Sequence, residues 1–327
     1  MFKRQILITG SAGFIGFHLS KNLTSRGYKV TGIDNINDYY DINLKLSRLK
    51  ILKKNINYSH ANFDLKNYNR LNKLISKLKP EFVIHLAAQA GVRYSLENPK
   101  AYIENNINCF FNILDVCKNN KVSNFIYASS SSVYGNKNLN KFKESNSTDN
   151  PMSLYAATKK TNEIIAKSYE NIYRINTTGL RFFTVYGPYG RPDMSLFKFT
   201  KQIIENKEIE VFNNGKHIRD FTYIDDIVDG ITKLLSKIYK SSNKKKFNKI
   251  YNLGNGNPQS LNEYIKIIEK ELSKKSKKKY LKLQIGDVYK TSANISQAKK
   301  DFGYSPKISI KYGIPQFINW YKNYYGY

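Results

Sequence analysis

Three closely spaced glycines near the N-terminus constrain this 327-residue chain more than any other stretch. They follow an apolar run, Ile6-Leu7-Ile8, and precede an amphipathic segment. Glycine allows a tight backbone turn and lets a ligand approach closely. The first turn of a helix adds free N–H groups and the positive end of its dipole. A glycine-rich turn without a ligand is the alternative. We predict a strand, a phosphate-binding turn and a helix, with ligand contacts from Gly10, Gly13, Phe14, Ile15 and Gly16.

The next apolar run, residues 30–33, ends in an acidic residue. Asp34 stands 18 positions after Gly16. A carboxylate there can accept hydrogen bonds from the ribose hydroxyls of a dinucleotide, which favours NAD over NADP. Apolar runs and helical patterns alternate as far as Phe182, and such alternation predicts a doubly wound parallel α/β sheet of the Rossmann type. The expected strands cover residues 5–9, 29–33, 57–62, 82–88, 124–128 and 176–182.

The pattern after Phe182 is weaker and predicts a smaller C-terminal substrate-binding lobe built from non-contiguous segments. Ile250–Leu253 is expected to return to the main sheet as a late strand. We therefore assign residues 1–182 to the Rossmann domain, with return segments at about 215–253, and residues 183–327 to the lobe. The expected elements of this region are helices at 195–206, 223–239, 261–273 and 310–325 and strands at 209–212 and 280–285.

A tyrosine and a lysine one helical turn apart indicate acid–base chemistry. Tyr155 and Lys159 share one face of the helix expected over residues 151–173, because side chains at i and i+4 are neighbours. An ammonium beside a phenol lowers the phenol pKa, and a phenolate can take and return the proton of an alcohol. An exposed polar pair is the alternative, because the chain has 26 tyrosines. The predicted proton relay is Ser130, and its competitors are Ser129, Ser131 and Ser132.

The net charge of +29, from 54 Lys and Arg against 25 Asp and Glu, raises the question of a nucleic-acid partner. The lysines are spread along the chain without an evident RNA- or DNA-binding motif, so we expect a basic surface that attracts an anionic substrate. Cys109 and Cys117 are too far apart on one helix for a disulfide, as is typical of a cytoplasmic protein. The four histidines show no metal-ligand spacing. Neither a signal peptide nor a membrane span is expected.

Longer motifs resemble a known family. The spacing Gly10-x-x-Gly13-x-x-Gly16 resembles the extended short-chain dehydrogenase/reductases, whose members mostly act on nucleotide sugars. Similarity to the UDP-glucuronate 4-epimerases, or to nucleotide-sugar epimerases and dehydratases more widely, covers nearly the whole chain. The chain departs from the family at Ile285, where a proline is usual, but it keeps Asp287. The motifs are residues 34–41 (DNINDYYD), 85–95 (HLAAQAGVRYS), 181–194 (RFFTVYGPYGRPDM) and 219–226 (RDFTYIDD).

The resemblance implies bound NAD, a UDP-sugar substrate, a homodimer and roles for further residues. Arg219 would clamp the pyrophosphate and Asp287 would hold the uridine end. Thr184 and Arg191 would face a carboxylate on the sugar, although Arg191 could instead pair with the nearby Asp193. Further cofactor contacts are expected from Asn35, Asp64, Leu65, Leu86, Ala87, Ala88, Gln89, Asn106 and Ser129, beside Tyr155 and Lys159. Further substrate contacts are expected from Arg93, Ser131 and Ser132.

Two of these cofactor contacts have a purely structural alternative. Asp64 could cap the helix that follows it, because carboxylates favour helix N-termini. Asn106 lies inside the helix expected over residues 98–119, where asparagine is unfavourable without a specific partner. A hydrogen bond in the core would satisfy it as well as a cofactor contact would.

The function implied is reversible epimerisation at C4 of UDP-glucuronate to UDP-galacturonate through transient oxidation by bound NAD, in polysaccharide biosynthesis. The alternatives are a 4-epimerase of UDP-glucose or UDP-N-acetylglucosamine and a UDP-glucuronate decarboxylase. A dehydratase is disfavoured because Ser131-Ser132 stands where an acidic pair would be needed. Outside enzymes, the chain could be a catalytically silent NAD-binding protein or a basic RNA-binding protein.

Overall fold

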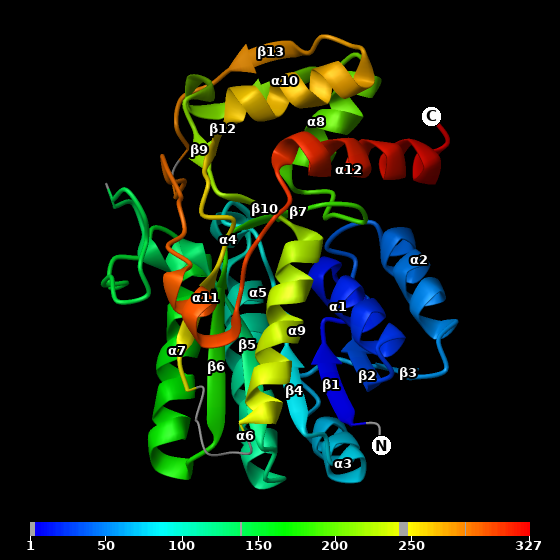
Figure 1. Ribbon diagram of the computed structural model, residues 1–327, viewed down its shortest axis with the longest axis vertical. Helices are drawn as coiled ribbons and strands as arrows, with labels where there is room; N and C mark the ends of the chain where they lie inside the picture. The colour runs from blue at the N-terminus through cyan, green and yellow to red at the C-terminus, as the bar shows by residue number, and fades with distance from the viewer. Residues whose placement is uncertain (1–3, 138, 242–247, 285) are drawn as a thin grey trace.

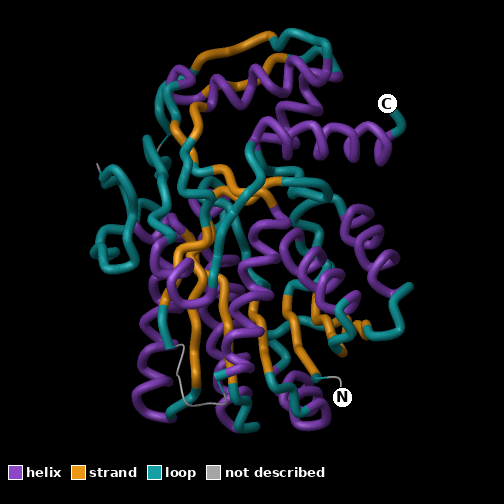
Figure 2. Tube along the Cα trace, in the orientation of Figure 1, coloured by secondary structure: helices purple, strands orange, loops and turns teal. Residues whose placement is uncertain are grey.

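A central sheet of seven parallel strands organises the protein (Figures 1 and 2). The computed structural model describes residues 4–137, 139–241, 248–284 and 286–327. The strand order is β11-β6-β5-β4-β1-β2-β3, which confirms the predicted doubly wound α/β class. The strands are β1 (Gln5–Thr9), β2 (Lys29–Asp34), β3 (Tyr58–Asn62), β4 (Phe82–His85), β5 (Asn124–Ser130), β6 (Asn176–Phe182) and β11 (Ile250–Leu253).

Helices cover both faces of the sheet, and β1 shows how the sequence dictates this. Ile6 and Ile8 belong to one buried cluster and Leu7 to the other, because side chains alternate between the faces of a strand. Such two-sided burial is typical of parallel sheets. On one side α1 (Phe14–Ser25) packs against α2 (Ile42–Lys53) and α9 (Ile224–Lys240). On the other side α6 (Cys109–Asn119) packs against α3 (Tyr68–Leu78) and α7 (Leu154–Tyr173).

The helix expected over residues 98–119 is interrupted. Short α5 (Pro99–Tyr102) leads into a π-helical segment, η1 (Ile103–Asn108), before α6 begins at Cys109. A π turn widens the helix locally and is frequent near functional sites. Here it contains Asn106, whose side chain makes the hydrogen bonds described below. Sequence periodicity did not reveal this change of helix type, because one extra residue in a turn barely alters the apolar pattern.

A smaller group of elements lies beyond the carboxyl ends of the main strands, at the top of Figure 1. Within it β8 pairs in parallel with β13, β9 pairs with β12, and β10 pairs with β7. These elements are β7 (Thr184–Tyr186), α8 (Ser195–Ile204), β8 (Glu208–Val211), β9 (Ile218–Arg219), β10 (Phe221–Tyr223), β12 (Gln259–Ser260), α10 (Leu261–Leu272), β13 (Lys277–Tyr280) and α12 (Ile310–Tyr325). The remaining short elements are α4 (Tyr94–Glu97), η2 (Ser131–Tyr134), η3 (Phe212–Gly215) and α11 (Ser296–Phe302).

The strand expected over residues 280–285 was placed wrongly. It spans Lys277–Tyr280, and Ile285 lies outside the described residues. The strand is rich in lysine, and its partner places glutamates opposite it: Lys277 faces Glu208, and Lys279 faces Glu210. Opposite charges across a strand pair stabilise the pairing. This strand therefore depends on its partner rather than on its own hydrophobicity, which the sequence pattern could not show.

Two buried histidines are expected to make the folded protein less stable in acid. His85 is 2% exposed, with Nδ1 2.8 Å from Thr9 Oγ1, and burial lowers its pKa to about 3. Burial likewise lowers the pKa of His18 to about 4. A histidine in the unfolded chain has a pKa near 6.5. Between that pH and the lower pKa of the folded state, the unfolded chain therefore binds more protons than the folded chain, which favours unfolding. The stabilisation is complete above pH 6.5 and is lost as the pH falls toward 3.

Denaturant unfolding between pH 7 and pH 4 tests this. We expect the unfolding midpoint to fall with pH, and to fall less steeply in His85→Asn, since the asparagine amide offers Thr9 a polar atom but does not titrate. Equal pH slopes for the two proteins would contradict the role of His85.

No helix in the described part of the chain is long and apolar enough to cross a membrane.

Candidate active site

One cavity of ≈ 1150 Å³ opens at the carboxyl ends of the main strands, where α/β sheets bind their ligands. Almost all the predicted site residues line it, although they come from segments spread between residues 10 and 287. The exception is Asn106. The predicted residues that line the cavity are Gly10, Gly13, Phe14, Ile15, Gly16, Asp34, Asn35, Asp64, Leu65, Leu86, Ala87, Ala88, Gln89, Arg93, Ser129, Ser130, Ser131, Ser132, Tyr155, Lys159, Thr184, Arg191, Arg219 and Asp287.

The glycine turn leaves no room for side chains. Gly10 has φ +71°, and a Cβ on it would lie 2.7 Å from the backbone N of Ala87. A Cβ on Gly16 would lie 2.1 Å from the carbonyl oxygen of Gly10. Gly13 precedes the first residue of α1, and no side chain of the described residues caps that helix end. The backbone N–H groups at the start of α1 are therefore available to a phosphate.

Two acidic side chains, Asp34 and Asp64, line the cavity. Asp34 accepts hydrogen bonds from the backbone N–H of Ala12 at 3.0 Å and of Ile36 at 2.9 Å. Asn35 donates to Asp64 at 2.9 Å. The cap of α3 is Asn67 rather than Asp64, which instead accepts from the Lys66 N–H at 2.8 Å.

Asn106 supports the cavity wall from behind. Its side chain accepts from the Gln89 N–H at 2.7 Å and donates to the Gln89 carbonyl at 2.9 Å and to Thr158 Oγ1 at 3.0 Å. Both backbone polar groups of Gln89, in the loop after β4, are thereby fixed, and Thr158 ties Asn106 to α7. The structure thus gives Asn106 the core hydrogen bonds that were the alternative to a cofactor contact.

Tyr155, Lys159 and Ser130 meet in the cavity, but the electrostatics differ from the prediction. Lys159 donates to the Ala128 carbonyl at 2.9 Å, and burial lowers its pKa to about 8. Burial raises the pKa of the Tyr155 phenol, while a hydrogen bond with Ser130 and the charge of Arg191 lower it. The expected lowering by Lys159 is therefore wrong: burial outweighs the cations, and the cation that acts on the phenol is Arg191.

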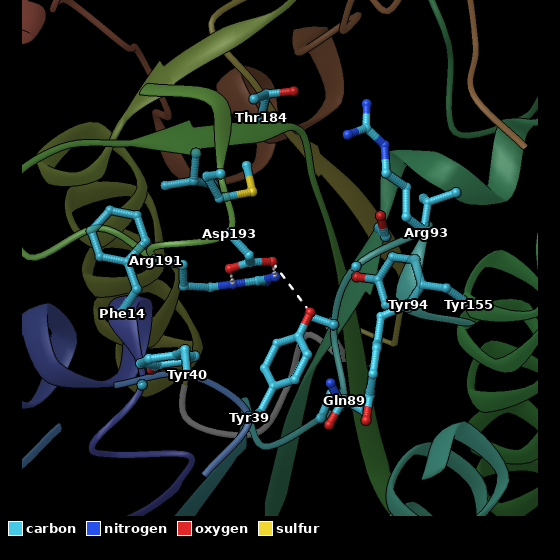
Figure 3. A pocket seen from close by; sticks show the side chains of 18 of the residues that line it. Phe14, Tyr39, Tyr40, Gln89, Arg93, Tyr94, Tyr155, Thr184, Arg191 and Asp193 are labelled. Atoms are coloured by element: carbon cyan, nitrogen blue, oxygen red, sulfur yellow. Dashed lines mark hydrogen bonds and ion pairs between the residues drawn. The ribbon is translucent and has the colours of Figure 1, made fainter. Parts of the chain in front are cut away.

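Arg191 forms a charged network with two residues that sequence reasoning did not assign to the site. Its Nε lies 3.0 Å from Asp193 Oδ1, and its Nη2 contacts Oδ2. The Tyr39 hydroxyl donates to Asp193 Oδ2 at 3.3 Å, and Figure 3 shows the three side chains meeting in the cavity. Desolvation raises the pKa of Tyr39 to about 12, so this phenol stays protonated. Arg191 thus lines the cavity and also makes the pair with Asp193; its role toward a carboxylate on the sugar stays a prediction.

A second pair of opposite charges lines the cavity. Arg219 Nη2 lies 2.9 Å from Asp287 Oδ1, and His217 Nε2 lies 3.3 Å from Asp287 Oδ2. Arg93 lies over the ring of Phe212, 4.3 Å from its centroid, in a cation–π contact. The cavity therefore offers the guanidinium groups of Arg93, Arg191 and Arg219 to an anionic ligand.

Comparisons with known proteins identify the family. The model of the "NAD dependent epimerase/dehydratase family" matches residues 6–254. UDP-glucuronate 4-epimerase 4 of Arabidopsis thaliana is 46% identical over 98% of this chain and 76% of its own. The chain belongs to the NAD dependent epimerase/dehydratase family. Protein CapI of Staphylococcus aureus is 48% identical over 98% of this chain and 99% of its own.

A solved structure of this family has the same fold. UDP-glucuronic acid 4-epimerase from Bacillus cereus, in complex with UDP-glucuronic acid and NAD, is 35% identical. It superposes with a TM-score of 0.91 and covers 98% of this chain and 100% of its own. The family's cofactor fits the site described here, because the glycine turn accepts no Cβ and leaves the start of α1 uncapped.

Proposed function

We propose that this protein is a UDP-glucuronate 4-epimerase that interconverts UDP-glucuronate and UDP-galacturonate with bound NAD. The observation that carries the proposal is that the Arg191 guanidinium lines the same cavity as Tyr155, where its charge acts to lower the phenol pKa. A uronate places its carboxylate one carbon beyond the ring, near the reacting C4 hydroxyl. A cation beside the catalytic base suits that carboxylate: Asp193 takes the Nε donor and one Nη2 donor of Arg191, so the substrate carboxylate would accept from the other N–H donors of this guanidinium.

The proposed chemistry assigns one task to each residue. Tyr155 takes the proton of the C4 hydroxyl, directly or through Ser130, and later returns it. Lys159, held by the Ala128 carbonyl, would add positive charge to the cavity and offer an N–H donor to the bound cofactor. NAD, when bound, would supply a hydride acceptor for C4, and return of the hydride to the opposite face of the 4-keto sugar would invert that carbon. Gly10, Gly13, Gly16 and Asp34 would hold this cofactor.

The carboxylate must also be restrained. Oxidation at C4 gives a β-keto acid, which loses CO₂ easily. We propose that Arg191, Ser131, Ser132 and Thr184 hold the carboxylate in an orientation that disfavours this cleavage. Arg219 would bind the pyrophosphate, with Asp287 at the uridine end, and Arg93 would contact the substrate from the rim of the cavity.

Proton NMR on purified protein mixed with UDP-glucuronate, with no cofactor added, tests this proposal. Formation of UDP-galacturonate is expected, and it would also show that NAD remains bound after purification. A UDP-pentose product would identify a decarboxylase and overturn the proposed hold on the carboxylate. Turnover of UDP-glucose or UDP-N-acetylglucosamine in place of UDP-glucuronate would refute the uronate role of Arg191 and Thr184. Turnover of no UDP-sugar would favour a silent NAD-binding protein.

We also propose the lobe division and a homodimer. The Rossmann part, residues 1–182 with return segments at about 215–253, would bind NAD, and residues 183–327 would bind the nucleotide sugar.

The dimer would form through α6 and α7, which expose apolar side chains: Phe111, Ile164, Ile172 and Tyr173. Sedimentation velocity should give a dimer for the wild-type protein and a monomer for Ile164→Lys. A monomeric wild-type protein would refute it.

The cellular setting is a further proposal. We infer a cytoplasmic enzyme that supplies galacturonate for polysaccharide biosynthesis and has no membrane or nucleic-acid partner. Free, buried Cys109 and Cys117 support a reducing compartment. A gel shift with RNA tests the basic surface, since a salt-sensitive shift would indicate nucleic-acid binding.

A further inference from the structure

Arg48 is fully buried at 0% exposure although it carries a charge. It lies on α2 and reaches three separate segments of the chain. Nη1 donates to the carbonyl of Ala12 and to the hydroxyl of Tyr40, both at 2.7 Å. Nη2 donates to the carbonyls of Tyr189 at 2.7 Å and Gly190 at 3.4 Å. Burying a charge is costly unless it is hydrogen-bonded, so this side chain must be held firmly by all of these acceptors.

Each of the three segments belongs to the active site. Ala12 lies in the glycine turn, and its N–H is held by Asp34 at 3.0 Å. Arg48 therefore holds the carbonyl of Ala12, while Asp34 holds its N–H. Tyr40 lies in the loop 34–41, whose Tyr39 contacts Asp193. Lys45, also on α2, anchors this loop a second time through two bonds of 2.6 Å to Asn37.

The third segment is the loop that carries Arg191. Tyr189 has φ +56°, a left-handed conformation that costs free energy in a residue other than glycine. Arg48 stabilises this conformation by donating to the Tyr189 carbonyl, and His18 Nε2 lies 2.9 Å from the Pro188 carbonyl. The position of Arg191 therefore depends on a guanidinium that also holds the glycine turn.

We propose that Arg48 is a positioning residue that couples the NAD site to the carboxylate site. Its planar fork joins the glycine turn to the loop 187–193, so that Arg191 is oriented relative to the cofactor. Lysine keeps the charge but has no fork, and it cannot reach both loops at once. The expected effect on UDP-glucuronate binding rests on the proposed function, whereas the expected effect on NAD retention does not.

The test is Arg48→Lys, with three readouts. We expect less NAD to be retained after gel filtration, and UDP-glucuronate to bind about tenfold more weakly by calorimetry, the effect of losing one charge-assisted hydrogen bond. UDP alone, which lacks the sugar carboxylate, should bind as tightly as to the wild-type protein. In an Arg191→Gln background, Arg48→Lys should weaken UDP-glucuronate binding little further, since coupled residues are not additive.

Control variants separate positioning from general instability. Arg4→Lys alters an arginine that pairs with Glu81 and stacks on Tyr239 away from the cavity, and it should change none of the readouts. If Arg48→Lys unfolds the protein, Tyr40→Phe removes one acceptor and should shift the same readouts less. Equal weakening of UDP and UDP-glucuronate, or additive effects with Arg191→Gln, would overturn the proposal. Retained NAD needs no substrate, so it tests Arg48 even if UDP-glucuronate is not the substrate.

Discussion

Tyr155→Phe should lower kcat for the proposed epimerisation by about 10²- to 10⁴-fold, the usual contribution of a positioned acid–base group. Phenylalanine preserves the ring, which packs edge-on against Tyr102 at 6.1 Å between centroids, and removes only the hydroxyl. The affinity for UDP-glucuronate should change little, because the phosphates and the carboxylate keep their guanidinium partners. Initial rates by NMR and binding by calorimetry measure the two quantities separately.

The pH dependence of the same variant gives a sharper test. Burial raises the pKa of Tyr155, so the phenolate fraction, and with it kcat of the wild-type enzyme, should rise with pH. The residual activity of Tyr155→Phe should lack this rise. Tyr169→Phe is the matched control, since Tyr169 lies on the same helix and donates to Asp115 at 3.2 Å. A variant that keeps a tenth or more of wild-type turnover would exclude Tyr155 as the acid–base group.

The parts of the site that could be predicted from sequence are those that depend on local spacing. The glycine turn needs consecutive backbone positions, and the Tyr155–Lys159 pair needs one helical turn, so both are visible in the sequence. Family resemblance added residues such as Arg219 and Asp287, which no spacing rule connects. Their mutual contact at 2.9 Å was not foreseen, because it joins segments 68 residues apart.

The residues that sequence reasoning missed act across the fold. Tyr39 reaches Asp193 over 154 positions, and Arg48 reaches Tyr189 over 141. In sequence, Arg48 is one basic residue among 54, and nothing local distinguishes it from Lys50 and Lys53, which are exposed on the same helix. The direction of the pKa shift of Tyr155 was mispredicted for a related reason: it depends on burial, and helical spacing contains no information on burial.

Glu163→Ala should lower the free energy of unfolding by about 3–5 kcal/mol, the cost of leaving one member of a buried ion pair without its partner. Glu163 lies on α7, one turn after Lys159, and both oxygens bind Arg181 of β6 at 2.8 Å. Both side chains are 3% exposed. Glu163 also accepts from Ser129 at 2.6 Å. Glu163 thus joins α7, which carries Tyr155, to β6 through Arg181 and to the end of β5 through Ser129. Its loss should therefore also reduce turnover.

Two further variants identify the cause of the destabilisation in denaturant unfolding. Glu170→Ala on the same helix breaks only the Lys167 pair, in which lysine is 60% exposed, and should cost less than about 1 kcal/mol. The double replacement Glu163→Met with Arg181→Met removes both charges and should be more stable than Glu163→Ala, since apolar side chains of similar volume often replace a buried ion pair at little cost. If the double variant is instead less stable than Glu163→Ala, the bonds to Ser129 and the sheet matter more than the uncompensated charge of Arg181.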